Sequence, residues 1–142
     1  MSALHATLVG MELQGVRVLL VDDDEATRYW IGRLLEKLGA DVTSASNVAE
    51  AMTALDRSVP DILLCDIAMP EVDGYQLIRQ VRSRAPEAGG KVPAIALTAY
   101  AVIPSMVEAS LRSGFQAHLS KPMEPDDLVR AVHSAMSGSA VQ

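Results

Sequence analysis

The sequence predicts an α/β fold in which a doubly wound parallel sheet is covered by helices on both faces. Short apolar runs that fit strands alternate five times with segments of helical periodicity, which is typical of parallel sheets with right-handed crossovers. The run over residues 62–65 is entirely apolar, as expected of a central strand buried on both sides, and it leads into Asp66. Open sheets of this class place their chemistry at the carboxyl ends of their strands.

The composition is that of an ordinary globular domain. Of the 142 residues, 49% are hydrophobic and 21% charged, which suffices for one domain with its own core. The formal net charge of −6 argues against direct binding to nucleic acid and favours a cation or a basic partner surface. The single cysteine, Cys65, fits a buried side chain in a reducing compartment. No membrane helix or signal peptide is recognised, so a cytoplasmic location is expected.

The chain is interpreted as one domain with short tails. Residues 1–14 show no clear period and fit a tail or linker, whereas residues 15–137 carry the alternating elements. Residues 138–142 are small and polar and fit a C-terminal tail. No internal repeat or low-complexity segment is present. The domain boundaries are therefore expected near residues 15 and 137.

The first strand is expected over residues 16–21. Asp24 is a plausible N-cap of the helix that follows, and Gly39 is expected to end that helix. Trp30 lies next to the apolar stripe of the helix and is interpreted as a packing residue rather than a ligand platform. The stripe itself has helical spacing and consists of Ile31, Leu34, Leu35 and Leu38.

Residues 40–45 fit a second strand, and either Ser46 or Asn47 is expected to cap the next helix. After the central strand, a third helix is predicted to begin near Gly74. Both helices carry apolar stripes. The inward positions are Val48, Ala51, Met52 and Leu55 in the first of them and Leu77, Ile78 and Val81 in the second.

The remaining elements complete the alternation. A fourth strand is predicted over residues 94–97, and a helix from near Pro104 to Gly114. A short fifth strand over residues 117–120 precedes a last helix that begins near Pro125. The inward positions of this last helix are Leu128, Val132 and Ala135.

Four of the predicted strands end in polar residues. These are Asp22, Asp23 and Asp24 together, and then Asp66, Thr98 and Lys121. In a parallel sheet these ends share one edge, where several carboxylates would repel one another unless a cation lay among them. Oxygen ligands at so small a site indicate Mg²⁺. With a lysine ammonium and a threonine hydroxyl, the edge can position a phosphoryl group, and Asp66 is the natural nucleophile for an aspartyl phosphate.

The same residues also have simpler interpretations. Acidic residues at a helix start often only cap it, and Asp24 is interpreted in this way. A lone threonine or lysine at a strand end carries little information. Polar residues of these four types at four strand ends, in this order, are hard to obtain by chance.

The motifs resemble the receiver domains of two-component response regulators, over about residues 15–136. The matching residues are Asp22-Asp23, Asp66, Met69-Pro70, Asp73-Gly74, Thr98-Ala99 and Lys121-Pro122. The resemblance implies a flavodoxin-like, five-stranded parallel sheet in the order 2-1-3-4-5. Residues 13–19 also resemble the junction before receivers in hybrid histidine kinases, so a domain excised from such a kinase is one interpretation.

The resemblance also implies roles for the site residues. Asp66 would accept a phosphoryl group from a phosphohistidine of a histidine kinase or a histidine phosphotransfer protein. Thr98 and Lys121 would bind the phosphoryl oxygens. Mg²⁺ would be organised by the carboxylates of Asp22, Asp23 and Asp66 and by the backbone carbonyl of Ala68. The receiver is expected to catalyse its own phosphorylation. Slow dephosphorylation is expected from this chain's own residues, because Ala68 offers no side-chain group to orient a water and Tyr100 could cover the approach with its ring.

The switch position departs from the family pattern. Receivers usually carry Tyr or Phe three residues before the lysine, and His118 stands there in this chain. Thr98 and His118 are the expected switch pair. They lie beside a face formed by the fourth helix, fifth strand and fifth helix, where Val102 and Ile103 are candidates for an apolar patch. The prediction is a homodimer or kinase docking through this face, strengthened by phosphorylation.

Two other functions compete with that of a phosphorylated receiver. A phosphatase of the haloacid dehalogenase type would use Asp22 as nucleophile and Asp24 as acid and base, but it needs a further acidic pair on a strand after Lys121 and leaves Asp66 unexplained. A receiver-like scaffold that is never phosphorylated is disfavoured because all the expected phosphorylation groups are present. The sequence therefore favours a phosphoacceptor with Mg²⁺ as its cofactor.

Overall fold

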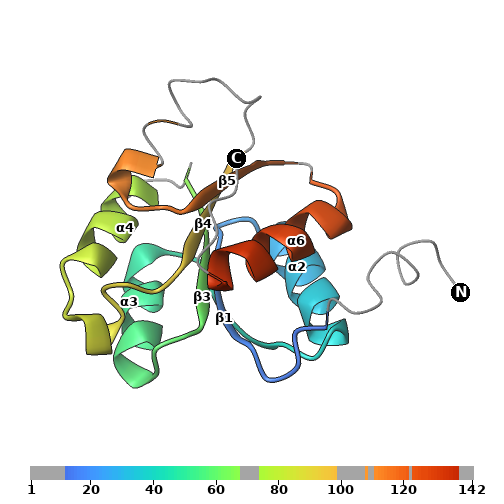
Figure 1. Ribbon diagram of the computed structural model, residues 1–142, viewed down its shortest axis with the longest axis horizontal. Coiled ribbons are helices and arrows are strands. Elements are labelled where there is room, and N and C mark those ends of the chain that lie inside the picture. Colours follow the sequence, from blue (N-terminus) through green and yellow to red (C-terminus); the bar gives the residue numbers. More distant parts are fainter. Residues whose placement is uncertain (1–11, 68–73, 99–107, 109–110, 122, 138–142) are drawn as a thin grey trace, which may run out of the picture.

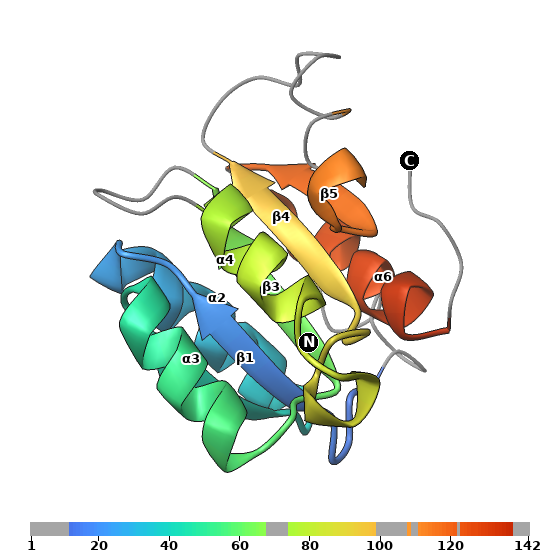
Figure 2. The ribbon, with the colours of Figure 1, turned by 90° about the vertical axis from the view of Figure 1, so that its left-hand side faces the viewer.

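Five parallel strands form one sheet in the order β2-β1-β3-β4-β5 (Figures 1 and 2). The computed structural model describes residues 12–67, 74–98, 108, 111–121 and 123–137. Within them the strands are β1 (Arg17–Val21), β2 (Asp41–Ala45), β3 (Ile62–Asp66), β4 (Ala94–Thr98) and β5 (Ala117–Ser120). The predicted α/β class and strand order are confirmed.

Helices cover both faces of the sheet. Figure 1 shows two helices on each side: α2 (Glu25–Lys37) and α6 (Pro125–Met136) on one, α3 (Val48–Arg57) and α4 (Gly74–Arg82) on the other. A short 3-10 helix, η1 (Pro86–Ala88), follows α4. The helix expected from Pro104 to Gly114 lies largely outside the described residues, although Glu108 and residues 111–113 are helical. In the described part of the chain, no helix is long and apolar enough to cross a membrane.

Alternate residues of each central strand fill two separate cores. Val18 and Leu20 of β1 pack in the cluster that includes α2 and α6, whereas Leu19 and Val21 pack in the cluster that includes α3 and α4. β3 is buried at all five positions, as its unbroken apolar run predicted. The two cores consequently fix the ends of the central strands from both faces of the sheet, and the residues that follow these strands are held in place.

The helix starts follow the predicted capping. The carboxylate of Asp24 accepts hydrogen bonds from the hydroxyl and the backbone N–H of Thr27, and these bonds lower the pKa of Asp24. Asn47, rather than Ser46, caps α3 by accepting from the Glu50 N–H at 2.8 Å. Ser46 instead donates through its N–H and hydroxyl to the Glu50 carboxylate, at 2.7 and 2.8 Å.

Two residues lie elsewhere than the sequence indicated. Leu13, which falls within the predicted tail, is 0% exposed, and its N–H donates to the Leu38 carbonyl at 2.7 Å. The packed structure thus begins before residue 15. Trp30 was interpreted as a packing residue but is 43% exposed, because other residues of α2, such as Ile31 and Leu35, occupy the face toward the core.

Arg82 joins the end of α4 to the segment before β5. Its Nε and Nη2 donate to the Gly114 carbonyl at 3.0 and 2.7 Å, and its Nη1 donates to the Gly90 carbonyl at 3.2 Å. Burial lowers the pKa of Arg82, and no carboxylate pairs with it in the described part of the chain. Its Nη2 also donates to Gln116 Oε1 at 3.2 Å, so the oxygens that hold the guanidinium are all neutral.

We expect Arg82→Met to lower the free energy of unfolding by about 2 kcal/mol, because hydrogen bonds from a charged donor contribute roughly 1.5–3 kcal/mol. Urea denaturation measures the change. The exposed Arg79 of the same helix supplies the control, Arg79→Met, which should change the free energy of unfolding by less than about 0.5 kcal/mol. Equal effects of the two substitutions would show that the carbonyl contacts contribute nothing.

Candidate functional site

Three polar residues at or just after strand ends are buried at one edge of the sheet. Asp22 follows β1 and is 0% exposed, Asp66 ends β3 and is 4% exposed, and Thr98 ends β4 and is 1% exposed. Because the strands are parallel, their carboxyl ends lie at the same edge (Figure 2). Burial of a polar group is unfavourable unless it finds a partner, so this edge is a site built for polar chemistry.

Three carboxylates gather at this edge. Asp22, Asp23 and Asp66 each offer one oxygen, and these oxygens lie within 4.8 Å of one another. Asp22 and Asp66 are buried and Asp23 is exposed, so the cluster opens to solvent on one side. An all-oxygen donor set of this size fits Mg²⁺, which keeps several of its waters. The residues present are therefore suited to the predicted metal.

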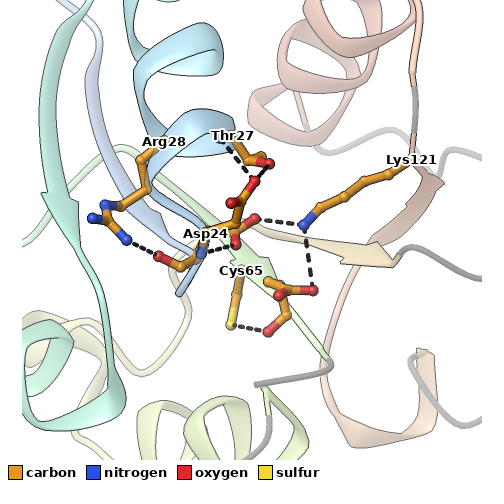
Figure 3. Close-up of polar contacts among 7 residues, drawn as sticks. Asp24, Thr27, Arg28, Cys65 and Lys121 are labelled. Atoms are coloured by element: carbon orange, nitrogen blue, oxygen red, sulfur yellow. Dashed lines mark hydrogen bonds and ion pairs between the residues drawn. The ribbon is translucent and has the colours of Figure 1, made fainter. Parts of the chain in front are cut away.

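Lys121 brings a positive charge into the cluster. Its Nζ lies 2.6 Å from Asp22 Oδ2 and 3.6 Å from Asp66 Oδ1 (Figure 3). The backbone N–H of Lys121 donates to the Thr98 carbonyl, so the end of β4 fixes the backbone from which the Lys121 side chain extends. A buried carboxylate pair needs such a counter-charge. The structure thus brings together Asp22, Asp66, Thr98 and Lys121 as the sequence predicted.

Asp22 is held at both its backbone and its side chain. The Asp24 N–H donates to Asp22 Oδ1 at 2.9 Å, and Arg28 Nη1 donates to the Asp22 carbonyl at 2.6 Å (Figure 3). The Asp22 N–H donates in turn to the Ala45 carbonyl at the end of β2. Arg28 was not predicted to take part in the site, because its partner is a backbone atom that no residue pattern reveals.

Gly74, the first residue of α4, lies close to the end of β3. Its N–H donates to the Ile67 carbonyl at 2.9 Å. A Cβ at this position would lie 2.6 Å from the Asp66 carbonyl oxygen and 2.8 Å from Ile67 Cα. Only glycine permits so close an approach. The sequence marked Gly74 as a turn into a helix, but the contact with Asp66 was not foreseen.

The predicted switch residue His118 lies on β5, in register with Ala96. Ser120, two residues further, is in register with Thr98, so both residues face the same side of the sheet as Thr98. His118 Nε2 and Ser120 Oγ are buried atoms without a hydrogen-bond partner in the described structure. Burial lowers the pKa of His118. The position therefore favours a neutral imidazole.

This lowered pKa predicts a pH dependence. Because the pKa of His118 is lower in the folded than in the unfolded chain, the unfolded chain binds more protons below about pH 6.5. The contribution of His118 to stability should therefore be complete above about pH 6.5 and decrease as the pH falls. His118→Phe removes the titrating group at similar volume and should flatten the dependence of the unfolding free energy on pH between about 5 and 7.5. Parallel curves for the two proteins would contradict this account.

Some predicted residues lie outside the described part of the chain. These are Ala68, whose carbonyl was predicted as a metal ligand, together with Val102 and Ile103 of the predicted contact face. After Lys121 the chain enters α6 at Pro125. The acidic strand that a haloacid dehalogenase phosphatase would need after the lysine therefore does not occur in the described residues.

The model of the response regulator receiver domain matches residues 18–133. The chain belongs to the receiver family of response regulators. The match covers β1 from its second residue and the other four strands in full, and it includes Asp22, Asp66, Thr98 and Lys121. The chain is thus a receiver domain of two-component signalling, and the phosphatase alternative has no further support.

Curated relatives place this receiver among proteins of different size. An uncharacterized 14.6 kDa protein of Leptolyngbya boryana is 49% identical over 115 residues, which cover 81% of this chain and 86% of that protein. The DNA-binding transcriptional regulator NtrC of Escherichia coli is 37% identical over 120 residues, or 84% of this chain and 24% of NtrC. Hybrid signal transduction histidine kinase D of Dictyostelium discoideum is 40% identical over 78% of this chain, which is only 8% of the kinase.

Solved structures confirm the receiver fold. A putative response regulator from Chloroflexus aurantiacus gives a TM-score of 0.81 at 31% identity, covering 87% of this receiver and 99% of that chain. The receiver domain of a Pseudomonas aeruginosa sensor histidine kinase gives 0.77 at 32% identity, covering 87% and 98%. That structure has a magnesium ion coordinated in its active site cleft.

Proposed function

We propose that this receiver domain, over residues 15–137, accepts a phosphoryl group on Asp66 from a phosphohistidine of a histidine kinase or a histidine phosphotransfer protein. One observation carries the proposal: the buried Asp66 carboxylate lies beside two further carboxylates and 3.6 Å from the Lys121 ammonium. An acidic residue in such a place serves little purpose for stability. It suits a nucleophile whose phosphorylated form is neutralised by the groups around it.

The transfer is a displacement at phosphorus. A carboxylate oxygen of Asp66 forms the new P–O bond while the P–N bond to the donor histidine breaks, and the released imidazole takes up a proton. Lys121 is placed to bind a phosphoryl oxygen, because its Nζ already lies near Asp66. The Thr98 hydroxyl at the end of the neighbouring strand is proposed to bind another. A bound Mg²⁺, held by Asp22, Asp23, Asp66 and the Ala68 carbonyl, would supply the positive charge that the phosphoryl oxygens require.

The experiment compares the wild type with Asp66→Asn. Each protein is incubated with acetyl phosphate or with a phosphorylated histidine phosphotransfer protein, with Mg²⁺ or with EDTA, and the mass of the intact chain is recorded. The wild type should gain one phosphoryl group only with Mg²⁺, and the variant none. Equal labelling of Asp66→Asn would refute the assignment. If the folded wild type is not labelled, the proposal is refuted in favour of a receiver-like scaffold that is never phosphorylated.

The docking surface of the donor protein is proposed to include α2. This helix begins beside Asp24 at the edge of the sheet that carries the site, and two of its aromatic side chains, Tyr29 and Trp30, are 69% and 43% exposed. Arg33 lies over the Tyr29 ring, 6.0 Å from its centroid. Exposed aromatic and arginine side chains are enriched where proteins bind one another.

We expect Tyr29→Ala combined with Trp30→Ala to slow transfer from a protein donor by tenfold or more, since Tyr and Trp are enriched among the interface residues whose truncation costs over ~1 kcal/mol. Transfer from acetyl phosphate should be unchanged, because this small donor makes no contact with α2. Lys37→Ala, at the far end of the helix, serves as the control. Equal losses with both donors would show that the substitutions damage the site rather than the docking surface.

The output of the domain is proposed to involve the face formed by the helix expected from Pro104 to Gly114, by β5 and by α6. Thr98 and His118 are proposed as its switch. Supporting it is the position of His118 on the same side of the sheet as Thr98. Self-association or docking of the kinase through this face should strengthen on phosphorylation. Light scattering of Ile103→Asp, with and without beryllofluoride as the phosphoryl mimic, tests it. An unchanged mass and unchanged partner binding in both conditions would contradict it.

A further inference from the structure

Arg28 is a cation beside the site that the proposed chemistry does not use. It lies in the second turn of α2, is half-buried, and reaches back six residues to the backbone carbonyl of Asp22 at 2.6 Å (Figure 3). The Asp22 N–H is bonded to the Ala45 carbonyl at 3.1 Å. The peptide groups on both sides of Asp22 Cα are therefore tied, one to β2 and the other to α2.

The direction of the Asp22 carboxylate depends on this tie. Its two oxygens are bonded separately, Oδ1 to the Asp24 N–H at 2.9 Å and Oδ2 to Lys121 Nζ at 2.6 Å. Both bonds require the backbone at Asp22 to stay where it is. Loss of the Arg28 contact would leave the carbonyl of a fully buried residue without this charged donor, and the turn between β1 and α2 would adjust.

The charge of Arg28 acts in the opposite direction. Hydrogen bonds from Ser46 lower the pKa of Glu50 at the start of α3, and the positive charge of Arg28 lowers it further. A positive charge so near the acidic cluster repels a metal cation. Anchoring by Arg28 thus favours binding of a divalent cation, whereas its charge disfavours it.

We infer that Arg28 is a positioning residue for the metal site, which acts by holding the Asp22 backbone so that the carboxylate points into the acidic cluster. This inference rests on the proposed function. Outer residues that orient metal ligands typically contribute 10–100-fold to metal affinity. Anchoring should therefore outweigh the repulsion by the half-buried guanidinium, whose charge is partly screened by solvent.

The test is Mg²⁺ binding, measured by calorimetry without any phosphodonor. Arg28→Met replaces the aliphatic part of the side chain and removes the donor, and it should weaken Mg²⁺ binding about tenfold. Arg28→Lys keeps one donor and should recover part of the affinity. Arg33→Met, an exposed arginine of the same helix, is the matched control.

The outcomes separate the two roles of Arg28. Tighter Mg²⁺ binding by Arg28→Met, with a gain that shrinks as salt is added, would show that Arg28 acts only by its charge and would overturn the inference. Unchanged affinity would also overturn it. Should Arg28→Met fail to fold, Arg28→Leu, which also lacks a donor, carries the same expectation. A folded wild type that binds no Mg²⁺ would instead refute the proposed function.

Discussion

Replacing Lys121 by Met is expected to lower the free energy of unfolding by about 3 kcal/mol in the absence of divalent cations. Lys121 Nζ lies 2.6 Å from a carboxylate oxygen of Asp22, whose side chain is 0% exposed, and 3.6 Å from Asp66. Removing the ammonium leaves two buried carboxylates facing each other without a counter-charge. The magnitude is at the low end for a broken buried pair, since the Lys121 side chain keeps 18% of its surface exposed.

The same variant should respond more strongly to Mg²⁺ than the wild type does. A divalent cation in the acidic cluster can replace the lost charge, and binding to the folded state alone raises the free energy of unfolding. Urea denaturation with and without MgCl₂ measures both effects. Lys91→Met, which removes an exposed lysine from a loop, is the control for the change in net charge. Equal stability of Lys121→Met and the wild type in EDTA would contradict the account.

Gly74→Ala is expected to lower the free energy of unfolding by about 3 kcal/mol, the upper part of the range for overpacking. The new Cβ would lie 2.6 Å from the Asp66 carbonyl oxygen and 2.8 Å from Ile67 Cα. Both are backbone atoms, so no side chain can rotate away, and the end of β3 has to move. Phosphorylation of Asp66 should slow as well, because its carboxylate would no longer face Lys121 in the same geometry.

Gly32→Ala is the matched control for Gly74→Ala. Gly32 is also a buried helical glycine, but a Cβ there would meet only Val42 Cγ1 at 3.9 Å, an ordinary contact. Alanine has the higher helix propensity, so Gly32→Ala should be neutral or stabilise by up to about 1 kcal/mol. If the two substitutions had the same effect on unfolding, the close approach of Gly74 to Asp66 would be without consequence.

The sequence predicted the features that repeat along the chain. The apolar runs and the helical stripes depend on local periodicity, and four of the strands lead into the polar residues of the site. Parallel pairing alone then gathers Asp22, Asp66, Thr98 and Lys121 at one edge. Asp66 could be identified because an acid directly after four apolar residues has no role in packing. The chemistry of the edge thus followed from residue types and their order.

The contacts that fix the site could not be predicted in this way. Arg28 and Arg82 bind backbone carbonyls, and every residue offers a carbonyl, so no pairing of residue types marks these bonds. The sequence indicates only a turn at Gly74, and its close approach to the Asp66 carbonyl is seen only in the structure. Leu13 packs in the cluster with residues of α2 and α6. A single buried residue has no periodicity, so nothing in the sequence marked it. These features depend on how elements meet in space.

The most direct test of the central claim is to locate the phosphoryl group on the chain. The protein is phosphorylated with acetyl phosphate and Mg²⁺ and then treated with borohydride, which reduces a phosphorylated aspartate to homoserine, and its peptides are analysed by mass spectrometry. The account predicts homoserine in place of Asp66, with Asp22 and Asp23 unchanged. Homoserine in place of Asp22, with Asp66 intact, would contradict it.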